Sequence, residues 1–138
     1  MDRIDEIVAR HADREGPLLP ILHDVQAELG CVDTAAEVRI ASLLNLSRAE
    51  VHGVVSFYHD FRDKADARPV VHVCRAEACQ ARGIEALIGE AKAAAGKRVR
   101  IETVYCLGLC SVGPNARVGD DLYARLDAPG LKRLLEEA

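Results

Sequence analysis

The sequence predicts an α+β chain in which a small helical bundle precedes a domain built on a four-stranded sheet. Up to about residue 63, apolar residues recur at the three- and four-residue spacing of helices; from Val70 on, they gather in short β-branched runs. A polar stretch that ends in proline, residues 63–69, separates the two patterns. We therefore expect a helical domain at residues 1–66 and a sheet domain at residues 67–138.

Signals for four helices occur in the N-terminal part. Gly30 lies where a glycine often ends a helix, and the pairs Thr34–Glu37 and Ser47–Glu50 each match a capping box. The positions that we expect to face the core are Ile4, Ile7, Val8 and His11 in the first helix, Leu18, Leu22, Val25 and Leu29 in the second, and Val51, Val54, Val55 and Tyr58 in the fourth. Four helices joined by short turns predict a small bundle.

The end of this part is aromatic. Phe57, Tyr58 and Phe61 recur at helical spacing, which favours packing in the core, with a face that docks a partner as the alternative. Cys31 lies far in sequence from the other four cysteines and is expected to be a small buried hydrophobe.

The C-terminal part alternates strands with helices. The elements that we expect are strands over 70–73, 99–103, 116–118 and 122–126, and helices over 84–91 and from Pro129 onward. This order, β-α-β-β-β-α, resembles a thioredoxin-like sheet with flanking helices. Its βαβ unit makes the first two strands parallel neighbours, so that their C-terminal ends lie at one edge of the sheet. Cys74 and Cys106 follow those two ends.

Four cysteines form two pairs in this domain. Four residues separate Cys74 from Cys79, 26 residues follow, and three residues separate Cys106 from Cys110. Sulfur ligands of one metal approach each other to about 4 Å, and short loops at strand ends can bring each pair that close. Two pairs offer the four thiolates that a 2Fe–2S cluster needs, two for each iron. We predict that these four cysteines bind one 2Fe–2S cluster.

The residues around the second pair support a cluster. Gly108 lacks a Cβ, so backbone N–H groups can approach sulfide or thiolate closely. Leu107 and Leu109 are expected to shield the sulfur from water, and Pro114 to hold the chain as it leaves the loop.

Other roles for the cysteines are weaker. A four-cysteine zinc site or four unligated cysteines remain open, although zinc ribbons usually have two residues between paired cysteines. A dithiol oxidoreductase would need Cys-x-x-Cys, and a Rieske centre would need two histidines in the loops; the sequence has neither. His72 precedes the first loop and is expected on the surface or in packing.

Composition excludes several classes of function. The net charge of −4 and the five Phe and Tyr residues argue against nucleic acid as a partner. The charged, amphipathic N-terminus does not resemble a secretory signal and no apolar run is long enough to span a bilayer, which points to the cytoplasm. No catalytic triad, carboxylate pair or phosphate loop is recognisable, so we expect no substrate site and no catalytic residue in this chain.

Three segments resemble one family. The segment 51–61 (VHGVVSFYHDF) is similar to the helix that precedes the ferredoxin domain in the 24 kDa, thioredoxin-like 2Fe–2S subunit of respiratory NADH dehydrogenase. The segments 74–83 (CRAEACQARG) and 106–114 (CLGLCSVGP) resemble the two ligand loops of that family, and all four ligand positions match. Within the family, the first loop and the short stretch between the pairs look most like the gamma subunits of molybdenum-dependent, NAD-linked formate dehydrogenases.

The resemblance implies an electron-transfer role in a larger oxidoreductase. The implied partners are a flavoprotein subunit that holds FMN and the NAD site, and a catalytic subunit with molybdenum and further Fe–S clusters. The equivalent subunit of a respiratory NADH dehydrogenase or of an NAD-reducing hydrogenase is the alternative, and a zinc-stabilised interaction module is a more distant one.

Overall fold

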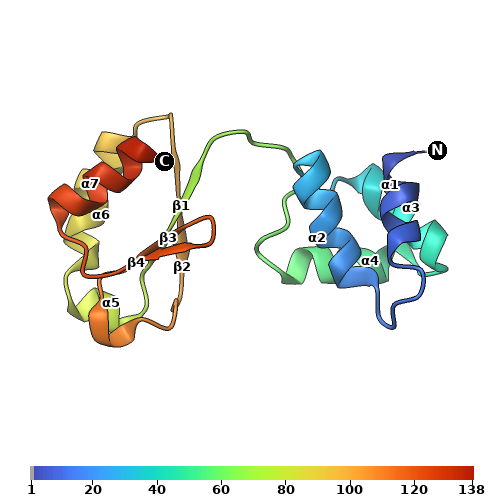
Figure 1. The fold of residues 1–138 in the computed structure, drawn as a ribbon, viewed down its shortest axis with the longest axis horizontal. Coiled ribbons are helices and arrows are strands. Elements are labelled where there is room, and N and C mark those ends of the chain that lie inside the picture. Colours follow the sequence, from blue (N-terminus) through green and yellow to red (C-terminus); the bar gives the residue numbers. More distant parts are fainter. Residues whose placement is uncertain (1) are drawn as a thin grey trace. The chain divides into compact units, whose positions relative to one another are not determined.

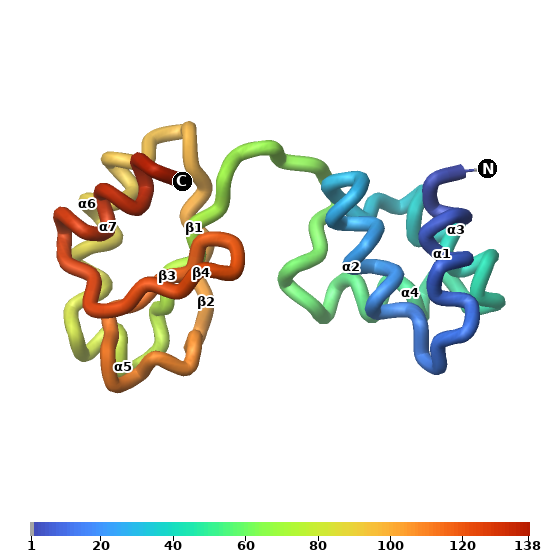
Figure 2. The backbone as a smooth tube through the Cα atoms, viewed as in Figure 1, coloured from blue at the N-terminus to red at the C-terminus, as the bar shows by residue number. Residues whose placement is uncertain are grey.

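A computed structural model describes residues 2–138. The chain divides into two compact units, Met1–Ala67 and Arg68–Ala138. Figures 1 and 2 show that the first is helical and that the second contains the sheet with its helices. The α+β class predicted from the sequence is confirmed. None of the helices within residues 2–138 is both long and apolar enough to cross a bilayer.

The helical unit contains α1 (Arg3–Arg10), α2 (Leu18–Leu29), α3 (Thr34–Leu44) and α4 (Arg48–Phe57). Its core is mainly aliphatic. The apolar faces of the four helices meet there and fully bury their branched side chains. The largest of these are Ile7, Ile21, Leu22, Val25, Ile40 and Val51. Phe61 closes the core after α4, as predicted. Gly30 ends α2 with a left-handed φ of 84°, which a glycine adopts without strain.

Four details of this unit differ from the predictions. The capping box at Ser47 is present, but α3 is capped by Asp33, whose carboxylate accepts the N–H of Ala36 at 2.8 Å. Thr34 therefore begins the helix, and Glu37 turns inward. Leu29 and Phe57 are 41% and 73% exposed, because Ile21 takes the core position in α2 and α4 ends at Phe57. Tyr58, beyond the helix end, is also exposed.

Glu37 instead holds two helices together. Its buried carboxylate lies 2.9 Å from Nδ1 of His52 and 3.3 Å from Nε of Arg48. A buried carboxylate needs such partners, so this residue belongs to the α3–α4 contact rather than to a cap.

The sheet unit contains β1 (Val70–Cys74), α5 (Glu77–Ala81), α6 (Ile84–Ala95), β2 (Arg100–Val104), the 3₁₀ turn η1 (Cys110–Val112), β3 (Ala116–Val118), β4 (Asp121–Tyr123) and α7 (Ala128–Glu137). The strands lie in the order β2-β1-β3-β4. The β1–β2 pair is parallel, as the βαβ unit predicts, and the other pairs are antiparallel. The short α5 was not predicted, because one turn of helix leaves no apolar periodicity.

The core of the sheet unit lies between the sheet and two helices. Figure 1 shows α6 and α7 side by side on one side of the sheet. Val71 and Val73 of β1 pack there against Ile84 and Leu131. The side chains of two cysteines, Cys74 and Cys79, belong to the same buried cluster. The hydrophobic core of this unit therefore extends into the cysteine region.

Candidate metal centre

The first cysteine pair is buried. Cys74 is the last residue of β1 and Cys79 lies in the one-turn helix α5; their exposed fractions are 2% and 1%. The bend between them is held by Gln80, whose side-chain amide donates to the carbonyl of Arg75 at 2.7 Å. Arg75 in turn forms a two-pronged ion pair with Glu85 at 2.8 and 2.6 Å.

The second cysteine pair is exposed and lies in a shaped loop. Cys106 follows β2 and Cys110 begins η1, and their sulfur atoms are 3.5 Å apart. The N–H of Gly108 donates to Sγ of Cys106 at 3.3 Å, the close approach predicted from the missing Cβ, and Gly108 has a φ of 78°. Cys106 itself has a φ of 90°, which is strained for a residue with a side chain. Such strain is concentrated at functional sites.

The parallel strands bring the two pairs together. Cys74 lies opposite Val104 in the β1–β2 register, and the N–H of Arg75 donates to the carbonyl of Val104 at 2.9 Å. Cys106 is two residues beyond that point. The chain that leaves the second loop also passes the first pair: the N–H of Cys74 donates to the carbonyl of Asn115 at 3.1 Å, and Gly113 lies next to Sγ of Cys79. The two loops therefore lie side by side at this edge of the sheet, as the topology predicted.

This convergence changes the acidity of the thiols. Burial alone would raise the pKa of Cys74, but the N–H groups of Ala76, Cys106 and Leu107 and the thiol of Cys79 together hold that pKa below its ordinary value. Burial, and then the nearby Cys74, raise the pKa of Cys79. The pKa values of these two neighbouring thiols are therefore shifted in opposite directions.

One cysteine of the exposed pair is affected in a similar way. The pKa of Cys110 is raised, chiefly by its hydrogen bond with Cys106 and by the charge of that neighbour, with a smaller contribution from Cys74. Cys110 also affects Cys79 electrostatically. All four sulfurs therefore interact, and a cation among them would relieve the repulsion between thiolates.

The residues present fit a cluster with two thiolates on each iron. Within residues 2–138 the cysteines meet as pairs, and no three His, Cys, Asp or Glu side chains surround a point where one metal ion could bind. A Cβ at Gly113 would lie 3.0 Å from Sγ of Cys79, so a side chain there would crowd this sulfur and one of the two would have to shift. Fe–S clusters require thiolate ligands, N–H groups that can donate to sulfur, and backbone that passes close to the sulfur atoms.

Several details of the site were missed or differ from the predictions. Leu107 and Leu109 are half-buried but leave both sulfurs of the second pair exposed, so the expected shielding is incomplete in this chain alone. Cys31 belongs to the helical unit and is half-buried rather than fully buried. The sequence analysis did not identify Gly113 as part of the site. A glycine that directly precedes a proline close to the cysteines could have indicated it.

Asn115 was also missed. It is buried beneath the ligand loops, whereas an asparagine after Gly-Pro usually indicates an exposed turn. Its side chain donates a hydrogen bond to the carbonyl of Leu109 in the second loop, so the residue belongs to the site.

A sheet that presents four thiols in two converging pairs defines a metal–thiolate protein, and comparison with known proteins identifies its family. The model of the thioredoxin-like [2Fe-2S] ferredoxin family matches residues 4–138. The chain belongs to that family, and its cofactor is one 2Fe–2S cluster.

Named relatives agree with this assignment. A subunit of the NADH-quinone oxidoreductase of Rhizobium meliloti is 31% identical over 98% of this chain and 86% of its own length. The NADP-reducing hydrogenase subunit HndA of Solidesulfovibrio fructosivorans is 27% identical over 90% of this chain and 78% of its own length.

A solved structure shows the same fold. A chain of an NAD+-reducing [NiFe]-hydrogenase in the H2-reduced state superposes with a TM-score of 0.73 and 26% identity over 88% of this chain. Only 22% of that hydrogenase chain is covered, so the present chain spans about a fifth of its length.

Proposed function

We propose that this chain is an electron-transfer subunit of an NAD-linked oxidoreductase, and that Cys74, Cys79, Cys106 and Cys110 are the ligands of its 2Fe–2S cluster. The observation that supports this most directly is that two cysteine pairs lie at one edge of the sheet, with the chain after the second pair passing next to Cys74 and Cys79. The cluster accepts and returns single electrons. The chain supplies the thiolates, the N–H donors and the buried surroundings that set its potential.

The parent enzyme that we propose is a cytoplasmic, NAD-dependent formate dehydrogenase. In it the chain would exchange electrons with a flavoprotein that holds FMN and the NAD site, and a molybdenum subunit with further Fe–S clusters would oxidise formate. The Cys-Arg-Ala-Glu-Ala-Cys-Gln loop at 74–80 and the short stretch between the pairs favour this branch. A respiratory NADH dehydrogenase or an NAD-reducing hydrogenase is the second candidate, favoured by the names of the relatives.

Metal analysis tests the cofactor and its ligands. Protein purified without oxygen should contain about two iron and two sulfide per chain, absorb visible light and give an EPR signal when reduced. Cys106→Ser should lose or destabilise this cluster, and Cys31→Ser should leave the spectrum unchanged. A colourless protein with one zinc per chain would refute the role, and loss of the cluster in Cys31→Ser would refute the ligand assignment.

Purification from the native host tests the parent enzyme. Copurification with a molybdenum formate dehydrogenase subunit and a flavoprotein is the expected result. A nickel hydrogenase subunit, or the membrane subunits of a respiratory complex, would instead establish the second candidate.

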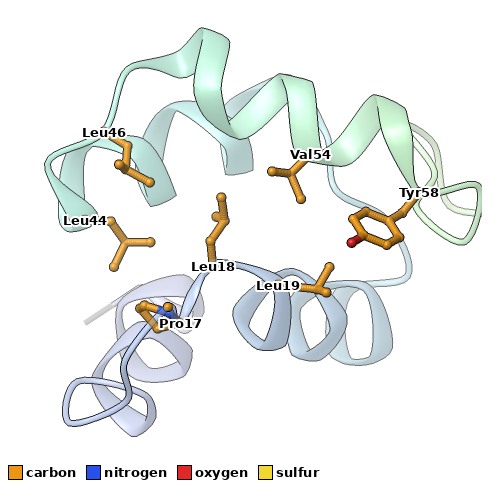
Figure 3. A pocket seen from close by; sticks show the side chains of 8 residues that line it. Pro17, Leu18, Leu19, Leu44, Leu46, Val54 and Tyr58 are labelled. Carbon is orange, nitrogen blue, oxygen red and sulfur yellow. The ribbon is translucent and has the colours of Figure 1, made fainter.

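We also propose that the helical unit docks a partner subunit. An apolar groove of about 450 Å³ opens between α2 and α4. Figure 3 shows Leu18 and Leu19 of α2, Val54 of α4, and Tyr58, which follows α4, facing it. Exposed apolar surface of this kind marks interaction sites, and the highly exposed Phe57 lies at the adjacent end of α4. Val54→Asp should abolish copurification of the partner while the cluster spectrum is retained; unchanged copurification would contradict this role.

A further inference from the structure

We propose that Cys106 and Cys110 are a site of reversible oxidation: before the cluster is loaded, a small disulfide converts them into an internal disulfide, which blocks loading until it is reduced. The effect on loading rests on the proposed function, because it takes both residues as cluster ligands. The oxidation itself depends only on the position and the exposure of the two thiols.

The two sulfur atoms are close enough to bond. Sγ of Cys106 lies 3.5 Å from Sγ of Cys110. An S–S bond is about 2.05 Å long, so the two sulfurs need to approach each other by about 1.5 Å. The loop between them contains Gly108, whose backbone freedom allows a movement of this size. The distance that suits two ligands of one iron thus also favours a disulfide.

Access distinguishes this pair from the first one. Cys106 and Cys110 are both exposed. The exposed fractions of Cys74 and Cys79 are 2% and 1%, and both side chains belong to the core of the sheet unit. An oxidant has to touch a thiolate to react with it, so buried cysteines are inert. We therefore expect oxidation to stop after the exposed pair.

The oxidation is an exchange with a low-molecular-weight disulfide. A thiolate of the exposed pair attacks one sulfur of that disulfide, and a mixed disulfide forms while one small thiol leaves. The second cysteine, also as a thiolate, then attacks the protein sulfur of the mixed disulfide, expels the other small thiol and closes the bond between Cys106 and Cys110. Two protein thiols are oxidised, the small disulfide is reduced to two thiols, and these thiols take up the two protons.

A chain oxidised in this way has too few ligands. The cluster needs four thiolates, two for each iron, and those of Cys74 and Cys79 alone would remain. Exposed disulfides are readily reduced, so a small thiol can restore the other two ligands. The oxidation state of the exposed pair would thus decide whether the chain can receive its cluster.

The experiment uses the whole chain. The cluster is removed from loaded protein with a chelator under reducing, oxygen-free conditions, and the chain, freed of reductant, is treated with oxidised glutathione. The remaining thiols are then alkylated, and the masses of the tryptic peptides are measured. Loaded protein treated in the same way is one control. Cys31→Ser is another, because Cys31 lies in the helical unit.

The sequence allows trypsin to distinguish the two pairs. A cleavage site between Cys74 and Cys79 places them on separate peptides, whereas residues 101–117 form one peptide that contains the whole exposed pair. An internal disulfide of that pair therefore gives a single peptide that is lighter by two hydrogen atoms and carries no alkyl group.

Peptide 101–117 should be oxidised in the wild type and in Cys31→Ser, while Cys74 and Cys79 are alkylated. Loaded protein should show no disulfide, because the sulfurs bind iron. Cys110→Ser should stop at a mixed disulfide between Cys106 and glutathione. When iron and sulfide are added, the oxidised wild-type chain should load at least several-fold more slowly than the same chain after reduction with a phosphine.

Any disulfide that includes Cys74 or Cys79 would overturn the inference. So would exposed thiols that stay fully open to alkylation, a mixed disulfide that does not close in the wild type, or equal loading of the oxidised and reduced chains. These results would leave the proposed function intact, because the wild-type protein as purified would still contain iron and sulfide. Wild-type protein that never contains them would refute the proposed function, and the oxidation of the exposed pair would still be measurable.

Discussion

The two units differ in what completes their cores. In the helical unit, buried apolar residues from four helices close on one another, and the described members of this cluster include no proposed ligand. In the sheet unit, Cys74 and Cys79 are members of the buried cluster. The first core consists of apolar side chains alone, whereas the second includes two of the thiols that we propose as cluster ligands. Folding of the sheet unit should therefore be coupled to its cofactor.

Backbone conformation shows the same difference. Among the described residues of the helical unit, one non-glycine residue has a left-handed φ: Asn45, at 54°, ends α3 and is of a type that tolerates this conformation. The sheet unit has two such residues, Arg125 at 51° before α7 and Cys106 at 90°, and at Cys106 a conformation of this kind costs roughly 1–3 kcal/mol. The hydrogen bond from Gly108 to Cys106 offsets part of that cost, and the proposed ligation of the cluster would offset more. The difference indicates that the sheet unit is adapted to its ligand and the helical unit to packing.

Removing the cluster should have the largest effect. We expect the sheet unit to melt more than about 10 °C earlier without it, because each kcal/mol lost shifts a domain of this size by about 4–8 °C. The helical unit should keep its transition. Calorimetry of cluster-free and loaded protein measures both, and equal melting temperatures for the sheet unit would contradict the coupling.

The sequence was most informative where one physical signal dominates. The βαβ pattern predicted the parallel β1–β2 pair, and with it the meeting of the two cysteine pairs. Ser47 and Glu50 predicted their capping box because that motif is local. Local spacing did not distinguish Thr34 from Asp33 as the cap of α3, since both residue types serve as caps. The capping box predicted at Thr34 also required Glu37, whose carboxylate instead pairs with His52 of α4.

Features that depend on tertiary contacts were not predictable. The exposure of Phe57 depends on where α4 ends, and the burial of Asn115 depends on how β3 passes beneath the ligand loops. The closeness of Gly113 to Cys79 likewise follows from α5, a turn too short to leave a pattern. The sequence therefore predicted the cysteines of the site. The backbone and the neighbouring residues that surround them became visible only in the fold.

A cavity in the helical core should have the next largest effect. Ile40 is fully buried, and Ile40→Ala should destabilise the helical unit by about 2–5 kcal/mol, because methyl groups are lost and the packing closes only partly. Iron content and the EPR spectrum should not change. Chemical denaturation, followed by the circular dichroism of the helices, measures the loss of stability. Metal analysis measures the iron content. Loss of iron in this variant would show that the two units are not independent in stability.

The smallest effect is expected from a single methyl group beside the cluster. In Gly113→Ala the new Cβ would lie 3.0 Å from Sγ of Cys79 and 3.4 Å from Cδ of Arg82. The arginine can move, but a sulfur held by iron cannot. Overpacking of this kind costs about 1–3 kcal/mol, so the loaded protein should be destabilised by roughly that amount and release iron faster.

Gly89→Ala is the matched control, because it makes the same change in the same unit without crowding. Gly89 lies on the exposed side of α6 and has nothing within 4 Å of the added methyl. Alanine is the better helix former there by about 0.5–1 kcal/mol, so this variant should be slightly stabilised with its iron retained. The two substitutions should thus shift the denaturation midpoint of the loaded protein in opposite directions. A neutral or stabilising shift in Gly113→Ala would mean that the backbone at Gly113 does not restrain Cys79, and that the cluster tolerates more movement in the sheet unit than its core implies.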